Sequence, residues 1–128
     1  MKIDRIDHLV LTVMDIKRTC AFYQSVLGFQ VITFGEGRKA LQSGAQKLNL
    51  HELGKEFEPK AAVPMPGAMD ICFITDVPIG EVLRELREKG VAVEEGPVER
   101  AGATGTLLSV YLRDPDWNLI EISNYVSE

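Results

Sequence analysis

The segment IDHLVLTVMDIKRTCAFYQSVLGF, residues 6–29, predicts the first two elements of the fold. Residues 6–13 are rich in β-forming side chains, which predicts a strand. Asp15 can then cap a helix, and Gly28 can end it, because glycine tolerates the left-handed conformation after a last helical turn. Between them an apolar stripe recurs at helical spacing, made of Ile16, Cys20, Tyr23 and Leu27. The chain therefore opens with a strand and an amphipathic helix.

The same order of elements is expected twice along the chain. After the first helix, β-rich runs separated by turn residues predict strands at 29–34, 38–42 and 46–53. The second half predicts a strand at 70–75, a helix between Pro78 and Gly90, a strand that opens at 91–93, and strands at 106–112 and 119–123. We therefore predict an α+β fold class and a single domain, residues 1–128, built from two βαβββ modules at about 3–57 and 67–125.

Composition narrows the class of protein. The net charge is −5 and the 14 Lys and Arg residues form no basic block, which argues against a nucleic-acid partner. No apolar run reaches the roughly 20 residues that a membrane span needs. The N-terminus has no signal-peptide pattern, and the only cysteines, Cys20 and Cys72, form no CxxC motif. These features predict a reducing, cytoplasmic location without a membrane partner.

Four predicted strands each carry one ionisable side chain on the face opposite their large apolar side chains. The four residues are His8, His51, Asp70 and Glu121, and they include both histidines of the chain. Each alone is ordinary, as a solvent-facing or locally hydrogen-bonded residue. Two imidazoles and two carboxylates at corresponding places of two repeats instead predict a site for a divalent metal ion such as Zn, Ni, Co, Mn or Fe(II).

Two long motifs carry a family resemblance. The front segment, residues 6–29, and YLRDPDWNLIEIS, residues 111–123, resemble the vicinal oxygen chelate superfamily, the glyoxalase, bleomycin resistance and dioxygenase group. Within it, residues 38–75 look like the glyoxalase domain-containing protein 5 and bacterial virulence-protein group. The resemblance implies a cupped mixed sheet around the metal and a homodimer whose sites are shared between modules. It places the metal ligands at His8, His51, Asp70 and Glu121.

Three departures from the family pattern stand out. Asp70 occupies a place where active relatives usually have histidine, so the two-histidine, one-carboxylate triad of extradiol dioxygenases is not reproduced. His51 stands where glyoxalase I-type relatives usually have glutamate. Trp117 replaces the glycine common in the DPDGN turn, a position that often needs a positive φ.

The resemblance implies a metal-dependent lyase or isomerase of glyoxalase type. Its small-molecule substrate would chelate the metal through adjacent oxygens and react through an enolate-like intermediate. Glu121 is the first candidate for the catalytic base and Asp70 the second; the alternative is that both carboxylates only hold the metal. The alternative functions are a metal-free or non-catalytic small-molecule binding or resistance protein, and an extradiol-type dioxygenase.

Other residues have two interpretations each. Phe34, Tyr111 and Arg113 are candidates for lining the substrate cavity, or else belong to the core or the surface. Residues 53–66 fit either a lid or a plain linker between modules. Cys72 is expected to be a small buried side chain rather than a nucleophile, since no basic neighbour is placed to lower its pKa.

Overall fold

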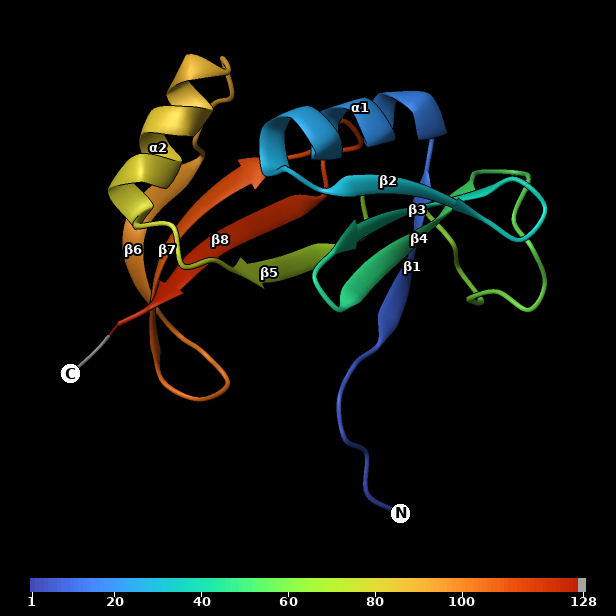
Figure 1. The fold of residues 1–128 in the computed structure, drawn as a ribbon, viewed down its shortest axis with the longest axis horizontal. Helices are drawn as coiled ribbons and strands as arrows, with labels where there is room; N and C mark the ends of the chain where they lie inside the picture. Colours follow the sequence, from blue (N-terminus) through green and yellow to red (C-terminus); the bar gives the residue numbers. More distant parts are fainter. Residues whose placement is uncertain (127–128) are drawn as a thin grey trace. The chain divides into compact units, whose positions relative to one another are not determined.

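The structure, a computed structural model, describes residues 1–126 and divides into two compact units, Met1–Ala68 and Met69–Glu128. Each unit contains four strands and one helix in the order βαβββ (Figure 1). The predicted α+β class and the two repeated modules are therefore confirmed. No helix within residues 1–126 is long and apolar enough to cross a membrane.

Unit 1 contains β1 (His8–Val13), α1 (Ile16–Leu27), β2 (Gln30–Phe34), β3 (Arg38–Ser43) and β4 (Gln46–Glu52). Its sheet has the order β1-β4-β3-β2, in which β1 and β4 are parallel and the other pairs antiparallel. The helix ends are those that the sequence predicts. The Asp15 side chain accepts a 3.0 Å hydrogen bond from the Arg18 N–H, and Gly28 is left-handed with φ 72°.

Unit 2 contains β5 (Asp70–Ile74), α2 (Ile79–Glu88), β6 (Glu95–Ala101), β7 (Thr106–Arg113) and β8 (Leu119–Tyr125). Its sheet repeats the topology of unit 1 in the order β5-β8-β7-β6, again with the first pair parallel. The two sheets therefore place their corresponding strands in the same order.

The strand expected to open at 91–93 is present as β6, but its predicted start is wrong, because β6 begins later, at Glu95. The sequence there suggests a turn, since Gly96 is followed by Pro97. However, β6 lies at the edge of its sheet, where a proline without an N–H donor is tolerated. Pairing with β7 shifts register between Glu95 and Val98, so the strand accommodates Gly96 and Pro97 as an irregularity.

The core of each unit lies between its helix and one face of its sheet. Tyr23 of α1 is fully buried and meets Phe29 edge to face, with ring centroids 5.6 Å apart. In unit 1 the strands contribute Leu11, Val13, Leu41, Leu48 and Leu50 to the buried set; in unit 2 they contribute Val110, Leu112, Ile120 and Ile122. Because side chains alternate along a strand, the residues between these apolar ones face the other side of the sheet.

The turn before β8 keeps the backbone shape of a glycine turn although Trp117 stands there. Trp117 has φ 67° and is the single non-glycine residue with positive φ within residues 1–126. The Asp114 carboxylate holds the turn by accepting hydrogen bonds from the N–H groups of Asp116 at 2.9 Å and Asn118 at 3.0 Å. The turn therefore delivers β8, and with it Glu121, in the register that the glycine version would give.

Candidate metal and substrate site

His8 is the first residue of β1 and is held by its neighbour in the sequence. Its Nδ1 lies 2.8 Å from Oδ2 of Asp7, and both side chains are exposed. The imidazole beside Asp7 lowers the pKa of that carboxyl. With Nδ1 donating to the carboxylate, the lone pair of Nε2 is left for a metal, and the ring is oriented as in carboxylate–histidine–metal sites. Sequence reasoning missed Asp7, although its position next to His8 is the signal.

The register of β1 and β4 separates the two histidines. His8 pairs with Lys47, whereas His51 pairs with Thr12, four residues further along β1. At the usual strand rise this offset is roughly 13 Å. The two imidazoles therefore share a face of the unit 1 sheet without being neighbours on it.

The two carboxylates of unit 2 are neighbours on their sheet. Glu121 of β8 pairs with Cys72 of β5, and Asp70 lies two residues before Cys72 on the same face. Diagonal neighbours of this kind are about 7–8 Å apart at the backbone, within reach of one shared ligand. The hydroxyl of Ser123 lies 3.3 Å from Oε2 of Glu121 and donates to it. Cys72 beside them is exposed rather than buried as expected.

The strand registers of the two units identify the residue of unit 1 that corresponds to Glu121. Asn49 pairs with Val10, two residues after His8, as Glu121 pairs with Cys72, two residues after Asp70. The counterpart of Glu121 in unit 1 is therefore Asn49, which sequence reasoning missed. Asn49 is buried, and its Oδ1 has no hydrogen-bond partner within residues 1–126. That His51 binds the metal stays a prediction.

His51 lies in a cationic and aromatic environment. It is only 4% exposed, and its ring centroid is 5.7 Å from that of Phe57. The guanidinium of Arg38 stacks on the rings of Phe57 and Phe34, 4.6 and 5.0 Å from their centroids, and its Nη2 lies 3.5 Å from Nε2 of His51. Burial first, and Arg38 second, lower the pKa of His51. The neutral imidazole is therefore favoured at pH 7.

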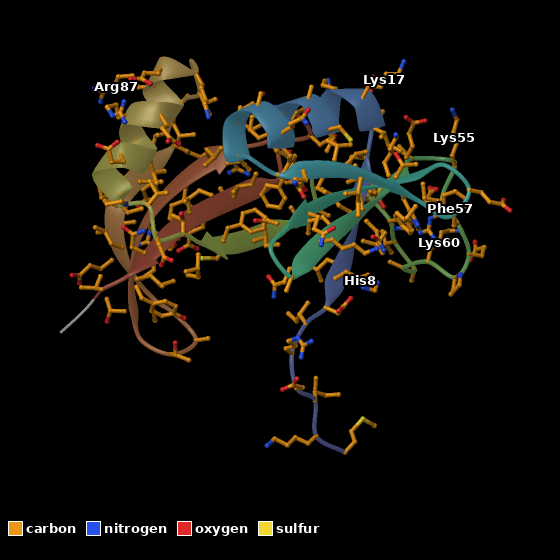
Figure 2. All side chains as sticks on the ribbon, viewed as in Figure 1. His8, Lys17, Lys55, Phe57, Lys60 and Arg87 are labelled. Carbon is orange, nitrogen blue, oxygen red and sulfur yellow. The ribbon has the colours of Figure 1, made fainter. Side chains whose placement is uncertain are left out.

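A cavity of about 240 Å³ opens beside His51 on the same face. It is lined by Val10, Thr12, His51, Pro59, Lys60, Ala61 and Pro64. The segment 53–66 thus covers this face of β1 and β4, and Figure 2 labels its residues Phe57 and Lys60. Glu58 forms an ion pair with Lys60 and raises the pKa of its ammonium, which stays charged.

The other candidate lining residues have local partners. The Tyr111 hydroxyl accepts a 3.0 Å hydrogen bond from Nε of Arg100. Arg113 donates to both carboxylate oxygens of Glu94, at 2.9 and 3.1 Å. These contacts hold β6 and the residues before it to β7, so they give the two side chains a structural role.

The donor groups fit a divalent metal in chemical type. Within residues 1–126, no three His, Cys, Asp or Glu side chains gather around one point. In unit 1 the imidazole of His8 is oriented by Asp7, and in unit 2 the carboxylates of Asp70 and Glu121 are neighbours on one sheet face. Imidazole nitrogen and carboxylate oxygen together suit Zn, Ni, Mn or Fe(II).

Comparison with known proteins agrees with this fold. Residues 5–122 match the Glyoxalase/Bleomycin resistance protein/Dioxygenase superfamily, and the chain belongs to that superfamily. It is 61% identical over 126 residues to virulence protein STM3117 of Salmonella typhimurium, covering 98% of this chain and 88% of that protein. It is 53% identical to the glyoxalase domain-containing protein RDO1 of Mycosarcoma maydis, covering 98% and 70%.

Solved structures show the same fold. The crystal structure of STM3117 matches with a TM-score of 0.97, covering 98% of this chain and all of that one. Lactoylglutathione lyase from Agrobacterium tumefaciens matches with a TM-score of 0.73 at 24% identity, covering 97% and 96%. TnmS3, an antibiotic binding protein from a Streptomyces species, matches with 0.76 at 21%, covering 98% and 99%. Members of this superfamily bind small molecules, commonly use a divalent metal and often act as dimers.

Proposed function

We propose that the protein is a metal-dependent lyase or isomerase of glyoxalase type, acting on a small substrate that chelates the metal through adjacent oxygens. The observation that carries this proposal is the pairing of donors. Asp70 and Glu121 are neighbours on one sheet face, and His8 is oriented by Asp7 with Nε2 left for a ligand. A binding protein without chemistry would have no need for this arrangement.

The roles divide among three residues. His8, Asp70 and Glu121 would hold the metal, which when bound supplies a Lewis acid for negative charge developing on a substrate oxygen. Glu121 also takes a proton from the substrate carbon beside that oxygen and returns it to a neighbouring carbon. The Ser123 hydroxyl, 3.3 Å from Oε2, orients the carboxylate for that transfer. His51 pairs with Thr12, four residues beyond His8 on β1, and this distance favours contact with the substrate over metal binding as its role.

The proposal includes a homodimer in a reducing cytoplasm. Each unit has one sheet face covered by its helix, and a second copy of the chain supplies the units needed to complete two symmetric sites. Cys20 and Cys72 are both free thiols, which suits a reducing compartment. Light scattering at micromolar concentration should give twice the mass of one chain, and a monomer would contradict this part of the proposal.

A second candidate is small-molecule binding without chemistry. It is favoured by the cavity beside His51, which is built from polar and apolar groups and needs no metal to hold a ligand. The likeness in fold to an antibiotic binding protein suits it as well. An extradiol-type dioxygenase has less support, since Asp70 replaces one histidine of its metal triad.

Deuterium exchange distinguishes the two candidates. The probe is 2-oxoglutarate, which has adjacent keto and carboxylate oxygens and acidic protons on C3. Zn²⁺-loaded protein in D₂O should exchange these protons faster than free Zn²⁺ does, as followed by proton NMR. Glu121→Gln should slow the exchange by about 10²–10⁴-fold, as expected for loss of a general base. Glu99→Gln on exposed β6 is the control and should match the parent. Exchange at the rate of free Zn²⁺ would leave the binding protein as the better assignment.

A further inference from the structure

The cavity beside His51 has an apolar part and a part rich in hydrogen-bond donors. Val10, Pro59, Ala61 and Pro64 supply hydrocarbon surface, and Thr12, His51 and Lys60 supply the polar groups. Thr12 is 7% exposed and His51 is 4% exposed, so both present their polar atoms largely out of contact with bulk water. Neither Glu56 nor Glu58 lines the cavity, although both lie in the segment that covers it.

The imidazole of His51 is set up as a donor. Arg38 lies between Phe34 and Phe57, and its Nη2 faces Nε2 of His51 at 3.5 Å. Since a guanidinium only donates, Nε2 acts as the acceptor, and the proton of the neutral ring lies on Nδ1. Arg38 is thus a positioning residue that fixes the tautomer of His51.

Lys60 supplies the charge. Its side chain is about one-third exposed and pairs with Glu58, whose own side chain is 72% exposed. An ammonium has three donors, so the ion pair leaves two of them for a ligand. A carboxylate that enters the cavity would therefore meet an ammonium, a hydroxyl and an imidazole N–H. Anions held by charged donors away from bulk water form the strong class of hydrogen bonds.

We propose that this cavity binds an anionic group of the substrate, most simply a carboxylate, through Lys60, Thr12 and His51, with the substrate's hydrocarbon chain against Val10 and the prolines. The inference rests on the proposed function and specifies its substrate class. That class is a small acid whose carboxylate lies several atoms away from the two oxygens that chelate the metal.

Position and size both suit such a molecule. His8, Val10 and Thr12 follow one another on one face of β1, so the cavity begins beside the residue next to the metal ligand on that face. Its volume of about 240 Å³ equals roughly eight water molecules at about 30 Å³ each. This is below the usual range for drug-sized ligands, so a short-chain acid fits better than a large conjugate.

The test compares two acids that differ only at the far end. 2-Oxoglutarate ends in a carboxylate, and 2-oxopentanoate has the same chain with a terminal methyl group. Their affinities are measured by calorimetry and by NMR shift changes on the full chain loaded with Zn²⁺, so that the metal holds the keto acid end that both molecules share. The parent should prefer 2-oxoglutarate by about tenfold or more, since hydrogen bonds to charged groups are the strong ones.

Substitutions show which side chains cause the preference for 2-oxoglutarate. Lys60→Met keeps the length of the side chain without its charge and should remove most of the preference, and Thr12→Val should reduce it. Lys55→Met is the matched control, because Lys55 lies in the same segment, pairs with Glu52 at 3.2 Å and does not line the cavity (Figure 2). It should bind both acids as the parent does.

The outcomes separate the two proposals. Equal binding of both acids by the parent, binding of neither, or an undiminished preference in Lys60→Met would overturn the anion site. Equal binding of both acids, or an undiminished preference in Lys60→Met, is compatible with Zn²⁺-dependent exchange of 2-oxoglutarate and leaves the proposed function standing, whereas binding of neither acid would contradict both proposals. Conversely, a Lys60-dependent preference in a protein that never exchanges C3 protons would support the anion site and reject the lyase or isomerase.

Discussion

The two units of this protein share one fold and differ on one face. Both have a helix over one side of a four-stranded sheet with the same strand order. On the other side, unit 1 is covered by residues 53–66 and carries Arg38 and Lys60 around a buried His51. Unit 2 leaves Asp70 and Cys72 exposed beside Glu121. One face is cationic and covered, and the other is acidic and open.

This difference shows which parts of a repeated fold can diverge. The helix-packed faces need only apolar residues at alternate positions, and the two units meet that need alike. The opposite faces are free to diverge because the core does not depend on them. In our proposal the acidic face of unit 2 contributes two metal ligands and a base, and the face of unit 1 contributes the third ligand, His8, and recognition of the substrate through His51 and Lys60.

The largest expected effect is on the stability of the protein, through the close contact between β6 and β7 of unit 2. An alanine Cβ at Gly96 would lie 2.5 Å from the Ser109 carbonyl oxygen and 2.9 Å from Cα of Val110, and Gly96 has φ 114°. Gly96→Ala should therefore lower the free energy of unfolding by about 2–4 kcal/mol, through overpacking and backbone strain together. Urea denaturation followed by circular dichroism measures it.

Gly44→Ala in the hairpin of unit 1 is the control for that substitution. Gly44 also has positive φ, at 58°, but a Cβ there meets open space. Its cost should be confined to the backbone, at about 1 kcal/mol. Equal losses for the two variants would show that the close approach of β6 to β7 is not what distinguishes unit 2.

The next effect is on the Zn²⁺ affinity, through Asp7, which orients His8. Asp7→Asn should lower the affinity for Zn²⁺ by about 10–100-fold, because partners that orient a metal-ligating histidine contribute that much. Asp4→Asn is the control, since Asp4 pairs with Arg5 on an exposed stretch. Competition with a chromophoric chelator measures both. An Asp7→Asn variant with the affinity of the parent would remove His8 from the proposed ligand set.

A smaller effect, of opposite sign, concerns the turn that delivers Glu121. Trp117→Gly should stabilise the protein by about 1 kcal/mol, since Trp117 holds φ 67° and its side chain is 68% exposed. The contact of Arg113 with the indole, 5.8 Å from its centroid, is lost and offsets part of the gain. Thermal unfolding measures the change. A loss of stability would mean that the indole packs more tightly than its exposure indicates.

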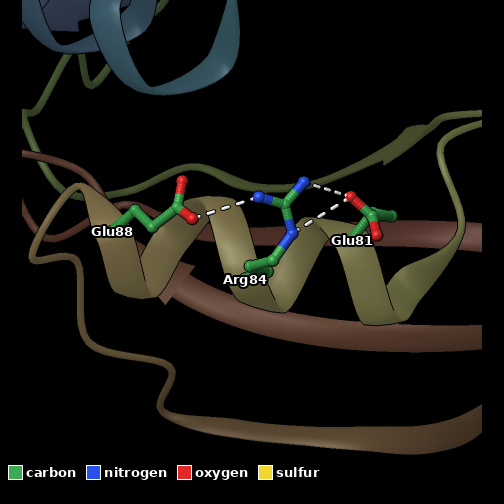
Figure 3. Close-up of polar contacts among 3 residues, drawn as sticks. All are labelled: Glu81, Arg84 and Glu88. Atoms are coloured by element: carbon green, nitrogen blue, oxygen red, sulfur yellow. Dashed lines mark hydrogen bonds and ion pairs between the residues drawn. The ribbon is translucent and has the colours of Figure 1, made fainter.

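The smallest effect is expected on the outer surface of α2. Arg84 forms ion pairs with Glu81 and with Glu88, the latter at 3.0 Å, along the exposed side of the helix (Figure 3). Exposed pairs of this kind contribute little and are screened by salt. Arg84→Met should leave the Tm and the Zn²⁺ affinity almost unchanged. A clear fall in Zn²⁺ affinity would show that the site of unit 2 extends through its helix.

The sequence predicts the parts of the fold that depend on local chemistry. Asp15 and Gly28 mark the ends of α1 because a side-chain cap and a left-handed residue are local requirements. The alternation of apolar residues also assigns His8, Asp70 and Glu121 to the face opposite the helices. A period of two identifies the face, and it carries no information on which residue of another strand lies opposite.

The features that the sequence does not predict depend on strand pairing and on the path of the loops. Pairing of β1 with β4 makes Asn49, rather than His51, the counterpart of Glu121. The start of β6 at Glu95 likewise follows from its place at a sheet edge, where Pro97 is accepted. The cavity depends on how residues 53–66 fold over β4, and a polar, proline-containing segment does not specify that path.

The division of roles between the two faces is tested most directly by Zn²⁺ titration of Asp70→Asn and His51→Gln beside the parent. Competition with a chromophoric chelator gives the three affinities, and circular dichroism shows that each variant is folded. Our account predicts that Asp70→Asn loses at least about a hundredfold in affinity, because a charged ligand is removed, whereas His51→Gln binds Zn²⁺ as the parent does. If His51→Gln loses as much as Asp70→Asn, His51 is a metal ligand and its proposed role in substrate recognition is contradicted.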